Sequence, residues 1–511
     1  MSDKIMYIPL DERPCNYQYP EMIYDIAEDK LIQPPLKLLG NKKQPADVDK
    51  LHNWIINNIQ DVSYLVLSID MLVYGGILPS RIHQLDLEKM FERLSLVKEI
   101  KSKNPDLKIF AFNLITRVPS YNSSDEEPEY YEEYGARIFK YGYLQDLINQ
   151  NLAEEKQREE FEQIQKEIPN DIISDYLNRR DKNHNLNTKV IDYVKDDLID
   201  FLVFPMDDNS EYGFSSMERT KIINKIKDKE LLNQIYSYPG ADEVGSILTA
   251  RAFLDKRNFK PQVFVNYSAE RGKTITPYLE DRPLEQTVQY QILAANGVVV
   301  DTPQEADYIL MVNTPTDGTM NSIEGWESIL NKEDIIDPSR NLHSFVESIK
   351  YYLKNIKIVS VADVAVLNGS DEFLMQLLKA NNLLEKLTSY GGWNTAANSI
   401  GTTVAHSHIM SYFKNKDDLS KKRIEISNKF LFLKYLEDWG YQHKIRADLT
   451  QNLDDYGLNY FNLKDKEAMI SNQVKKRLVN FQKEYLSSFN YNFSVEMPWN
   501  RMFEVKIEID K

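Results

Sequence analysis

The strongest constraint on the fold is a series of short, uninterrupted apolar runs that end in polar residues. The clearest run is Phe201 to Phe204, made of aromatic and branched residues and followed by Pro205-Met206-Asp207-Asp208-Asn209. An apolar run of this length without alternation is typical of a strand that is buried on both faces of a parallel sheet. Ligands of α/β proteins bind at the carboxyl ends of such strands. Asp207 and Asp208 are therefore candidates for a functional pair.

Comparable runs recur along the first 400 residues. They span residues 5–10, 64–70, 108–113, 234–238, 262–267, 308–313 and 358–363. Stretches with helical spacing separate them, such as Leu87 to Ile100, where apolar residues recur every three or four positions. Strands that alternate with helices predict an α/β protein with a parallel sheet.

Two α/β architectures agree with this pattern. One is a TIM-type (β/α) barrel over residues 1–412, with an appended helical region at 413–511 that ends in a strand over Phe493 to Ile509. The other is a pair of doubly wound α/β domains, the first ending near Leu254. The short apolar stretch Val298 to Val300 fits the second arrangement. We favour the barrel, because a barrel brings the polar groups of all its strand ends to one rim.

Composition narrows the choice of partners and compartment. A formal net charge of -16 disfavours nucleic acid and anionic membranes, because both would repel the average surface. Cys15 is the only cysteine, so we expect no disulfides, no cysteine-type zinc site and a reducing compartment. The start of the chain lacks the apolar region of a signal peptide, and no apolar run could span a bilayer. We expect a cytoplasmic protein; the sequence does not indicate its oligomeric state.

Many further polar side chains follow the predicted strands. We expect substrate binding by Asp11, Arg13, Asn16, Asp70, Tyr74, Arg117, Asn209, Asp242, Glu243, Asn266, Asn313, Asp363, Trp393 and Asn394. The alternative for any one aspartate or asparagine among them is that it caps the following helix. For Asp242 and Glu243 this alternative is equally good, because carboxylates are favoured at the start of a helix.

Several kinds of chemistry lack support in the sequence. No G-x-S-x-G elbow is present, and no G-x-G-x-x-G or Walker loop occurs, so we expect no nucleotide cofactor. His406 and His408 are two positions apart on a predicted helix, where their rings point in nearly opposite directions and cannot bind one ion. We therefore assign no metal ligands. The strand-end carboxylates could still bind magnesium or manganese, so a metal-dependent hydrolase stays an alternative.

Acid–base catalysis on a carbohydrate fits the remaining residues best. Neighbouring carboxylates raise each other's pKa, and a general acid needs a raised pKa. Cleavage of a glycosidic bond requires a carboxyl that protonates the leaving oxygen. We therefore expect a glycoside hydrolase with Asp207 and Asp208 as catalytic residues and a small carbohydrate substrate. The alternative is a non-catalytic protein that binds sugars or other metabolites through the same carboxylates.

The stretch from Tyr121 to Tyr143 is rich in glutamate and tyrosine, with acidic residues clustered from Asp125 to Glu129. A solvated insertion is the simpler interpretation. The alternative is a lid whose tyrosine rings stack on a sugar.

Five motifs together resemble an uncharacterised bacterial domain-of-unknown-function family over nearly the whole chain. They are Leu10-Asp11-Glu12-Arg13-Pro14-Cys15-Asn16, Asp70 with Tyr74-Gly75-Gly76 and Ser80-Arg81, Asp207-Asp208-Asn209, Gly240-Ala241-Asp242-Glu243, and Gly392-Trp393-Asn394-Thr395. This resemblance implies no activity.

The pair Asp207-Asp208 also resembles, more loosely, the paired aspartates of the O-GlcNAcase-like β-N-acetylglucosaminidases. That resemblance implies a substrate-assisted mechanism, in which Asp207 orients the 2-acetamido group of the substrate and Asp208 is the general acid and base. The glycine-rich aromatic sequence that this family carries after its first strand is absent here.

Overall fold

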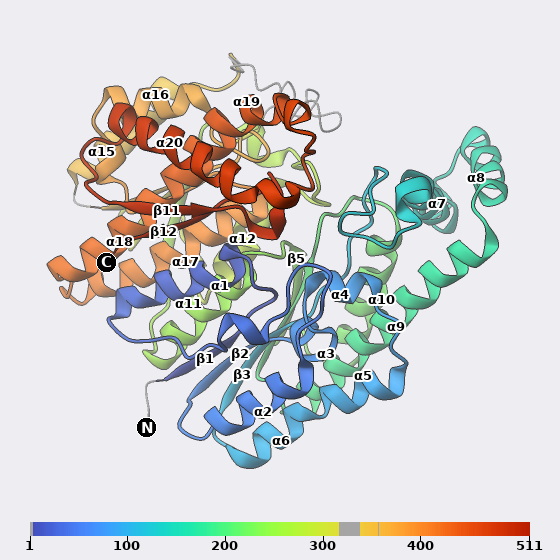
Figure 1. Ribbon diagram of the computed structural model, residues 1–511. Helices are drawn as coiled ribbons and strands as arrows, with labels where there is room; N and C mark the ends of the chain where they lie inside the picture. Colours follow the sequence, from blue (N-terminus) through green and yellow to red (C-terminus); the bar gives the residue numbers. More distant parts are fainter. Residues whose placement is uncertain (1–3, 316–337, 356, 511) are drawn as a thin grey trace. The chain divides into compact units, whose positions relative to one another are not determined.

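The computed structural model describes residues 4–315, 338–355 and 357–510 (Figure 1). The chain divides into two compact units. The first contains Met1–Glu12, Lys30–Leu248 and Leu279–Asp281, and the second contains Arg13–Asp29, Thr249–Tyr278 and Arg282–Lys511. The chain therefore passes between the units five times.

The first unit is built on a parallel sheet of five strands in sequential order. They are β1 (Ile5–Ile8), β2 (Tyr64–Ser68), β3 (Lys108–Phe112), β4 (Phe201–Met206) and β5 (Ile235–Pro239). Every residue of β1, β2 and β4 is buried, which explains why these strands lack polar alternation.

A layer of helices connects these strands. It contains α2 (Val48–Asn58), α3 (Ile69–Tyr74), α4 (Ile77–Ile82), α5 (Leu87–Leu94), α6 (Leu96–Lys103), α7 (Tyr131–Asn149), α8 (Glu155–Glu167), α9 (Asn170–Lys195) and α10 (Phe214–Asp228). Right-handed crossovers between sequential strands place the connecting helices on one face of a sheet. Contacts of α2 with α3, α3 with α5, α5 with α9 and α9 with α10 agree with one continuous layer of these five helices.

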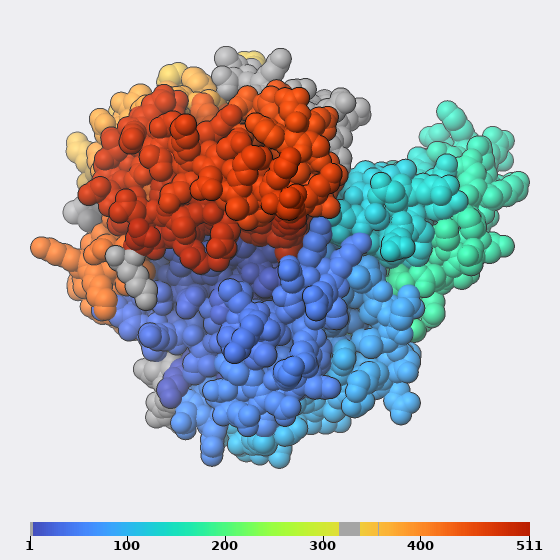
Figure 2. All heavy atoms as spheres, viewed as in Figure 1, coloured from blue at the N-terminus to red at the C-terminus, as the bar shows by residue number. Residues whose placement is uncertain are grey.

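Helices α7 and α8 extend away from the strands of their unit (Figure 1), and the same residues, cyan to green, form a protrusion in the space-filling view (Figure 2). They have a hydrophobic core of their own, which includes Tyr131, Ile138, Ile164, Tyr176 and Phe214. Because Phe214 begins α10, this core attaches the extension to the loop that follows β4.

The second unit has another parallel sheet of five strands. In spatial order they are β10 (Ser389–Gly391), β9 (Ile358–Asp363), β8 (Tyr308–Asn313), β6 (Gln262–Tyr267) and β7 (Val298–Val299). The strands that follow β6 in sequence lie on both sides of it, so the order reverses between β6 and β8. Such a reversal is the topological switch point of an open α/β sheet.

The helices of the second unit are α1 (Pro14–Tyr24), α12 (Leu284–Ala294), α15 (Leu342–Lys354), α16 (Glu372–Ala380), α17 (Ala396–Asn415), α18 (Lys421–Lys434), the π-helix η5 (Tyr435–Ile445), α19 (Arg446–Gln451) and α20 (Glu467–Tyr485). Helix α11 (Val244–Lys256) is shared, because the division falls after Leu248. Short 3₁₀ turns are η1 (Asp25–Ala27), η2 (Leu36–Leu38), η3 (Arg271–Thr274), η4 (Leu384–Lys386), η6 (Asp454–Tyr456), η7 (Lys464–Lys466) and η8 (Pro498–Asn500).

The barrel that we favoured is wrong for the described strands, which divide between two open sheets with separate edges. The alternative of two α/β domains agrees with this arrangement. The reason is that a barrel and two open sheets have the same alternation of strands and helices along the chain. They differ only in which strands pair, and the described β5 and β6 do not pair.

Residues beyond 413 belong to the second unit. The strand that we expected over Phe493 to Ile509 is a hairpin of two short antiparallel strands, β11 (Phe493–Glu496) and β12 (Lys506–Ile509). Pro498 follows β11 and begins the 3₁₀ turn η8, so the extended backbone stops there. Among the residues described, none of the helices combines the length and the apolar character needed to cross a bilayer.

Candidate functional site

The loop after β4 holds the predicted catalytic pair in an uncommon backbone conformation. Asp208 has a φ of 23°, a left-handed value that costs a non-glycine residue free energy. Hydrogen bonds hold the residues on either side of it, from the Asp207 amide to the Ile115 carbonyl (3.4 Å) and from the Asn209 amide to the Leu279 carbonyl (3.0 Å). The surrounding chain thus stabilises a strained aspartate at the end of a buried strand.

Each aspartate of the pair forms an ion pair with a different arginine. Arg81 donates to Oδ2 of Asp207 (2.5 Å), and Arg117 donates to Oδ2 of Asp208 (2.8 Å). In the part of the chain that the structure describes, neither Oδ1 atom has a hydrogen-bond partner. Both carboxyls therefore keep one oxygen available for a ligand.

Two glutamates complete this network, and the sequence did not identify them as site residues. Arg81 binds Glu126 (2.9 Å) and lies 3.5 Å from Glu127, and Arg117 binds the same glutamates at 2.7 and 2.9 Å. We expected this acidic run to be a solvated insertion or a lid, yet Glu127 is only 3% exposed. The signal that could have found the pairs is the presence of Arg81 and Arg117 in the segments that connect β2 to β3 and β3 to β4, because buried guanidinium groups need carboxylate partners.

Asp70 follows β2 directly and lies in the first turn of α3. Its Oδ2 accepts hydrogen bonds from the Asn113 side chain (3.2 Å) and the Leu114 amide (2.9 Å). Burial, with a smaller contribution from the charge of Asp207, raises the pKa of Asp70 to about 7 against the lowering effect of these hydrogen bonds. Tyr74 in the same helix donates to the Asn183 side chain (2.9 Å).

The pKa of Asp208 is also raised, to about 6. Burial is the largest cause and the charge of Asp207 the second, while Arg117 and Arg81 lower the pKa. The side chain keeps 22% of its surface exposed. Asp208 is thus a carboxyl that holds its proton up to nearly neutral pH and still reaches solvent.

Asn209 is buried, with 6% exposure, and neither its amide nitrogen nor its amide oxygen has a hydrogen-bond partner among the described residues. Such a side chain is rare in a native protein, because leaving a buried polar group unpaired costs about 1–3 kcal/mol. A ligand that supplies one donor and one acceptor would remove this cost.

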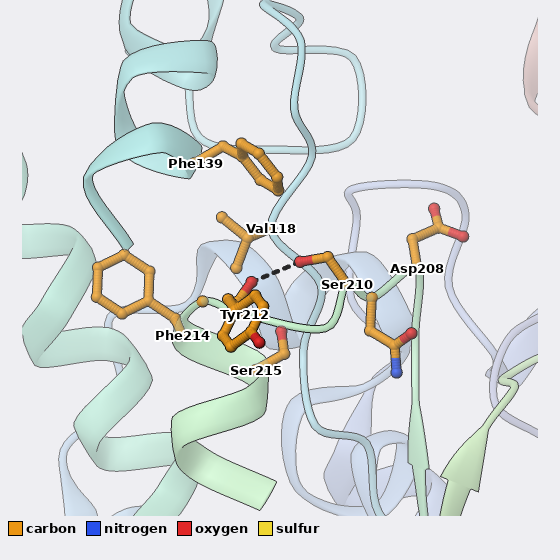
Figure 3. Close-up of a pocket in the computed structure, with 9 residues that line it drawn as sticks. Val118, Phe139, Asp208, Ser210, Tyr212, Phe214 and Ser215 are labelled. Carbon is orange, nitrogen blue, oxygen red and sulfur yellow. Dashed lines mark hydrogen bonds between the residues drawn. The ribbon is translucent and has the colours of Figure 1, made fainter. Parts of the chain in front are cut away.

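A hollow borders these residues on the side of α7 (Figure 3). Its lining is Val118, Phe139, Asp208, Asn209, Ser210, Tyr212, Gly213, Phe214 and Ser215. The rings of Phe139 and Tyr212 lie on either side of Val118, and the Asp208 carboxyl points away from Phe214. The hollow therefore has an aromatic part and a polar part that contains Asp208.

The second sheet carries a different polar cluster at its carboxyl edge. Asp363 at the end of β9 accepts hydrogen bonds from the Asn313 side chain (2.8 Å), the Asp371 amide (2.7 Å) and the Tyr390 hydroxyl (2.9 Å). Asn313 also donates to Asp371 (3.0 Å), and Arg340 binds both of these residues. Burial, followed by the charge of Asp371, raises the pKa of Asp363 to about 7.

The other predicted site residues of the second unit lie in different surroundings. Arg13 lies over the Trp499 ring (4.6 Å) and 3.8 Å from Glu504, and Asn16 is buried in α1. Trp393 is buried, and its indole nitrogen has no partner among the described residues. Asn394 has a φ of 64° and accepts a hydrogen bond from the Asn368 amide (3.1 Å), and Asn266 is half-buried in β6. The structure thus places Arg13, Asn16, Asn266, Asn313, Asp363, Trp393 and Asn394 in one unit and the other predicted residues in the other.

Glu243 accepts a hydrogen bond from the Ala241 amide (3.0 Å) directly before α11. The position of Asp242 and Glu243 directly before α11 agrees with the helix-start alternative. Asp11 and Asp242 are buried in the first unit, with 2% and 5% exposure.

Over the described ranges, no three histidine, cysteine, aspartate or glutamate side chains come together in a group that could bind a metal ion. His406 pairs with Ser427 (2.8 Å) and His408 with Tyr308 (3.0 Å), so the two rings have separate partners. Burial lowers the pKa of each histidine to about 3, so both rings are neutral.

Comparison with protein-family models gives one match, which covers residues 5–508 and is described as "Protein of unknown function (DUF4127)". The chain belongs to this family. The resemblance to an uncharacterised family is thereby confirmed, while the looser resemblance to O-GlcNAcase-like enzymes gains no support. A search of curated proteins finds no match.

Proposed function

We propose that this DUF4127 protein is a glycoside hydrolase in which Asp208 is the general acid. The observation that carries the proposal is the set of unpaired groups on three consecutive residues, Asp207 Oδ1, Asp208 Oδ1 and the Asn209 amide. A general acid works best when its pKa lies near the working pH, and the pKa of Asp208 is raised to about 6. A protein that only binds sugars needs no such proton donor.

The charges around the pair favour an uncharged substrate. Arg81 and Arg117 are both occupied by carboxylates, and four carboxyl groups pair with these two guanidinium groups: Asp207, Asp208, Glu126 and Glu127. An anionic substrate would meet excess negative charge and arginines that are already paired. A neutral polyhydroxylated sugar can instead donate hydroxyl protons to the open carboxylate oxygens.

The finer proposal is a substrate-assisted β-N-acetylhexosaminidase. Oδ1 of Asp207 would accept the N–H of the 2-acetamido group, whose carbonyl oxygen attacks the anomeric carbon. The bond from this carbon to the leaving oxygen breaks as Asp208 gives that oxygen its proton, and the leaving group departs as an alcohol. Asp208 then takes a proton from the water that attacks the anomeric carbon and restores the acetamido group. No cofactor enters this sequence.

The test measures release of chromophore from an aryl N-acetyl-β-glucosaminide, within a broad panel of aryl glycosides. Asp208→Asn keeps the size of the side chain but carries no acidic proton, and we expect kcat/KM to fall by about 10²–10⁴-fold. The matched control is Asp192→Asn, which changes a partly exposed aspartate of the same unit that binds Lys229. Absence of turnover on the whole panel would overturn the proposal. Tight sugar binding without product would instead support the sugar-binding alternative.

Two further assignments accompany this proposal. The switch point between β6 and β8 favours a doubly wound fold for the second unit. The single cysteine, Cys15, is buried and free of disulfides, which favours a cytoplasmic location.

A further inference from the structure

The hollow beside Asp208 contains aromatic side chains that hydrolysis itself does not require. Its aromatic part comes from α7 and from the loop after β4, which lie more than sixty residues apart in sequence. Two contacts fix α7 to this loop. The Asp146 side chain accepts a hydrogen bond from the Gly213 amide (2.9 Å), and Gly142 packs so closely on Phe214 that a Cβ would come within 2.5 Å of its ring.

The aromatic rings of the hollow continue along α7. Phe139 and Tyr143 stack with ring centroids 6.3 Å apart and planes 23° apart, and Tyr143 meets Tyr212 edge-on at 5.9 Å. All three side chains are half-buried, so part of each ring is open to a ligand. The ring faces of all three and the hydroxyls of Tyr143 and Tyr212 provide the combination of polar and apolar surface that a sugar ring also presents.

On these grounds we propose that the hollow formed by Val118, Phe139, Tyr212 and Asn209 is a subsite for the leaving group, and that this leaving group is itself a sugar. The inference rests on the proposed function, in which Asp208 protonates the departing oxygen and therefore lies beside it. The hollow borders Asp208 directly, so the unit attached to that oxygen lies against the rings. Asn209 supplies the donor and the acceptor for its hydroxyls.

The same construction disfavours charged leaving groups and very small ones. A phosphate or nucleotide would bring negative charge next to Asp207, Asp208 and Glu126, and both nearby arginines are already paired. A small alcohol would fill none of the aromatic part. The substrate class is therefore an oligosaccharide or another glycoside with an uncharged sugar on the leaving side.

The experiment compares two substrates with the same reacting sugar. One is the N-acetylglucosamine dimer, and the other is methyl N-acetyl-β-glucosaminide, whose leaving group cannot reach the rings. If the aryl panel identifies another sugar, the dimer and methyl glycoside of that sugar are used. The readout is the ratio of kcat/KM for the dimer to kcat/KM for the methyl glycoside in the full-length protein.

We expect Phe139→Ala and Tyr212→Ala each to lower this ratio at least tenfold, and Phe139→Tyr to restore it to within threefold of the wild-type value. The matched control is Tyr134→Ala, an aromatic residue of α7 that does not line the hollow and lies near Arg137. This control should leave the ratio within twofold. An unchanged ratio in both Phe139→Ala and Tyr212→Ala would overturn the inference.

Binding separates failure of this inference from failure of the proposed function. Calorimetric titration with N-acetylglucosamine oligomers of one to four units needs no turnover. If the wild type hydrolyses nothing but binds the longer oligomers at least tenfold more tightly than Phe139→Ala does, the hydrolase proposal fails and the subsite stands. If the wild type neither hydrolyses nor binds the oligomers, both fail.

Discussion

The carboxyl edges of the two sheets contain similar residues in opposite states. Asp208 after β4 and Asp363 at the end of β9 both have a raised pKa, about 6 and about 7, chiefly because of burial. Asp208 keeps an oxygen without a partner, whereas both oxygens of Asp363 accept hydrogen bonds, three in total. A raised pKa alone therefore does not distinguish the proposed catalytic carboxyl, Asp208, from Asp363. The two differ in the unpaired oxygen that Asp208 keeps.

The two asparagines of these edges show the same contrast. Asn209 has no partner at either end of its amide, while Asn313 donates to Asp363 and Asp371 and accepts from Arg340. One edge leaves hydrogen-bonding capacity for a ligand, and the other uses its capacity within the protein. This difference can be tested by exchanging matched residues.

The largest effect should come from the two aspartates. We expect Asp208→Asn to lower kcat/KM by about 10²–10⁴-fold and to leave the thermal unfolding midpoint nearly unchanged. Asp363→Asn should leave kcat/KM nearly unchanged and lower the thermal unfolding midpoint. Its new amide nitrogen would face a hydrogen-bond donor, which costs about 1–3 kcal/mol of the free energy of unfolding. Steady-state kinetics and thermal unfolding of both variants measure these effects. Equal losses of activity in the two variants would contradict the difference between Asp208 and Asp363.

The asparagine pair should differ mainly in stability. Asn313→Ala removes the hydrogen bonds that Asn313 makes with Asp363, Asp371 and Arg340, so we expect a loss of about 2–3 kcal/mol. Asn209→Ala removes no side-chain hydrogen bond within the described residues and should not lower the free energy of unfolding, while KM rises. Urea denaturation measures the first effect, and a large destabilisation by Asn209→Ala would show that this edge is structural too.

The pH dependence should appear in different properties at the two edges. The pKa of Asp363 is raised in the folded state, so its contribution to stability is complete below about pH 4, the unfolded pKa, and is lost as the pH rises through 7. Asp208 must be protonated to act, so kcat/KM should fall as the pH rises above about 6.

Each part of this pH prediction has its own variant. The difference in unfolding midpoint between wild type and Asp363→Asn should shrink from pH 4 to pH 7. Asp207→Asn removes a charge that raises the pKa of Asp208, so the falling limb of the rate profile should move to lower pH in whatever activity survives. A limb that does not move would indicate that Asp208 is not the titrating acid.

The smallest effect should come from Tyr390→Phe. It removes one of the three hydrogen bonds to Asp363 and one to Ser370, at a cost of about 1 kcal/mol. Because this hydrogen bond lowers the pKa of Asp363, its removal should also raise that pKa. Thermal unfolding over a pH series measures both changes, and hydrolysis should be unaffected.

The sequence was enough to find most strands and the polar groups at their ends. Burial on both faces removes polar residues from β1, β2 and β4, so each appears as a continuous apolar run. The same reasoning identified Asp207, Asp208 and Asn209, because the end of a parallel strand directly places the residues that follow it. These relations hold between residues close together in the sequence, so the sequence alone is enough to predict them.

Pairing at long range could be determined only by the tertiary structure. Which strands share a sheet depends on hydrogen bonds between segments distant in sequence, so a barrel and two open sheets could not be told apart. Glu126 and Glu127 looked like a solvated run until Arg81 and Arg117 were seen to bind them. Whether a carboxyl keeps a free oxygen, as Asp208 does, or has every oxygen bonded, as Asp363 does, depends on neighbours that only folding brings into contact.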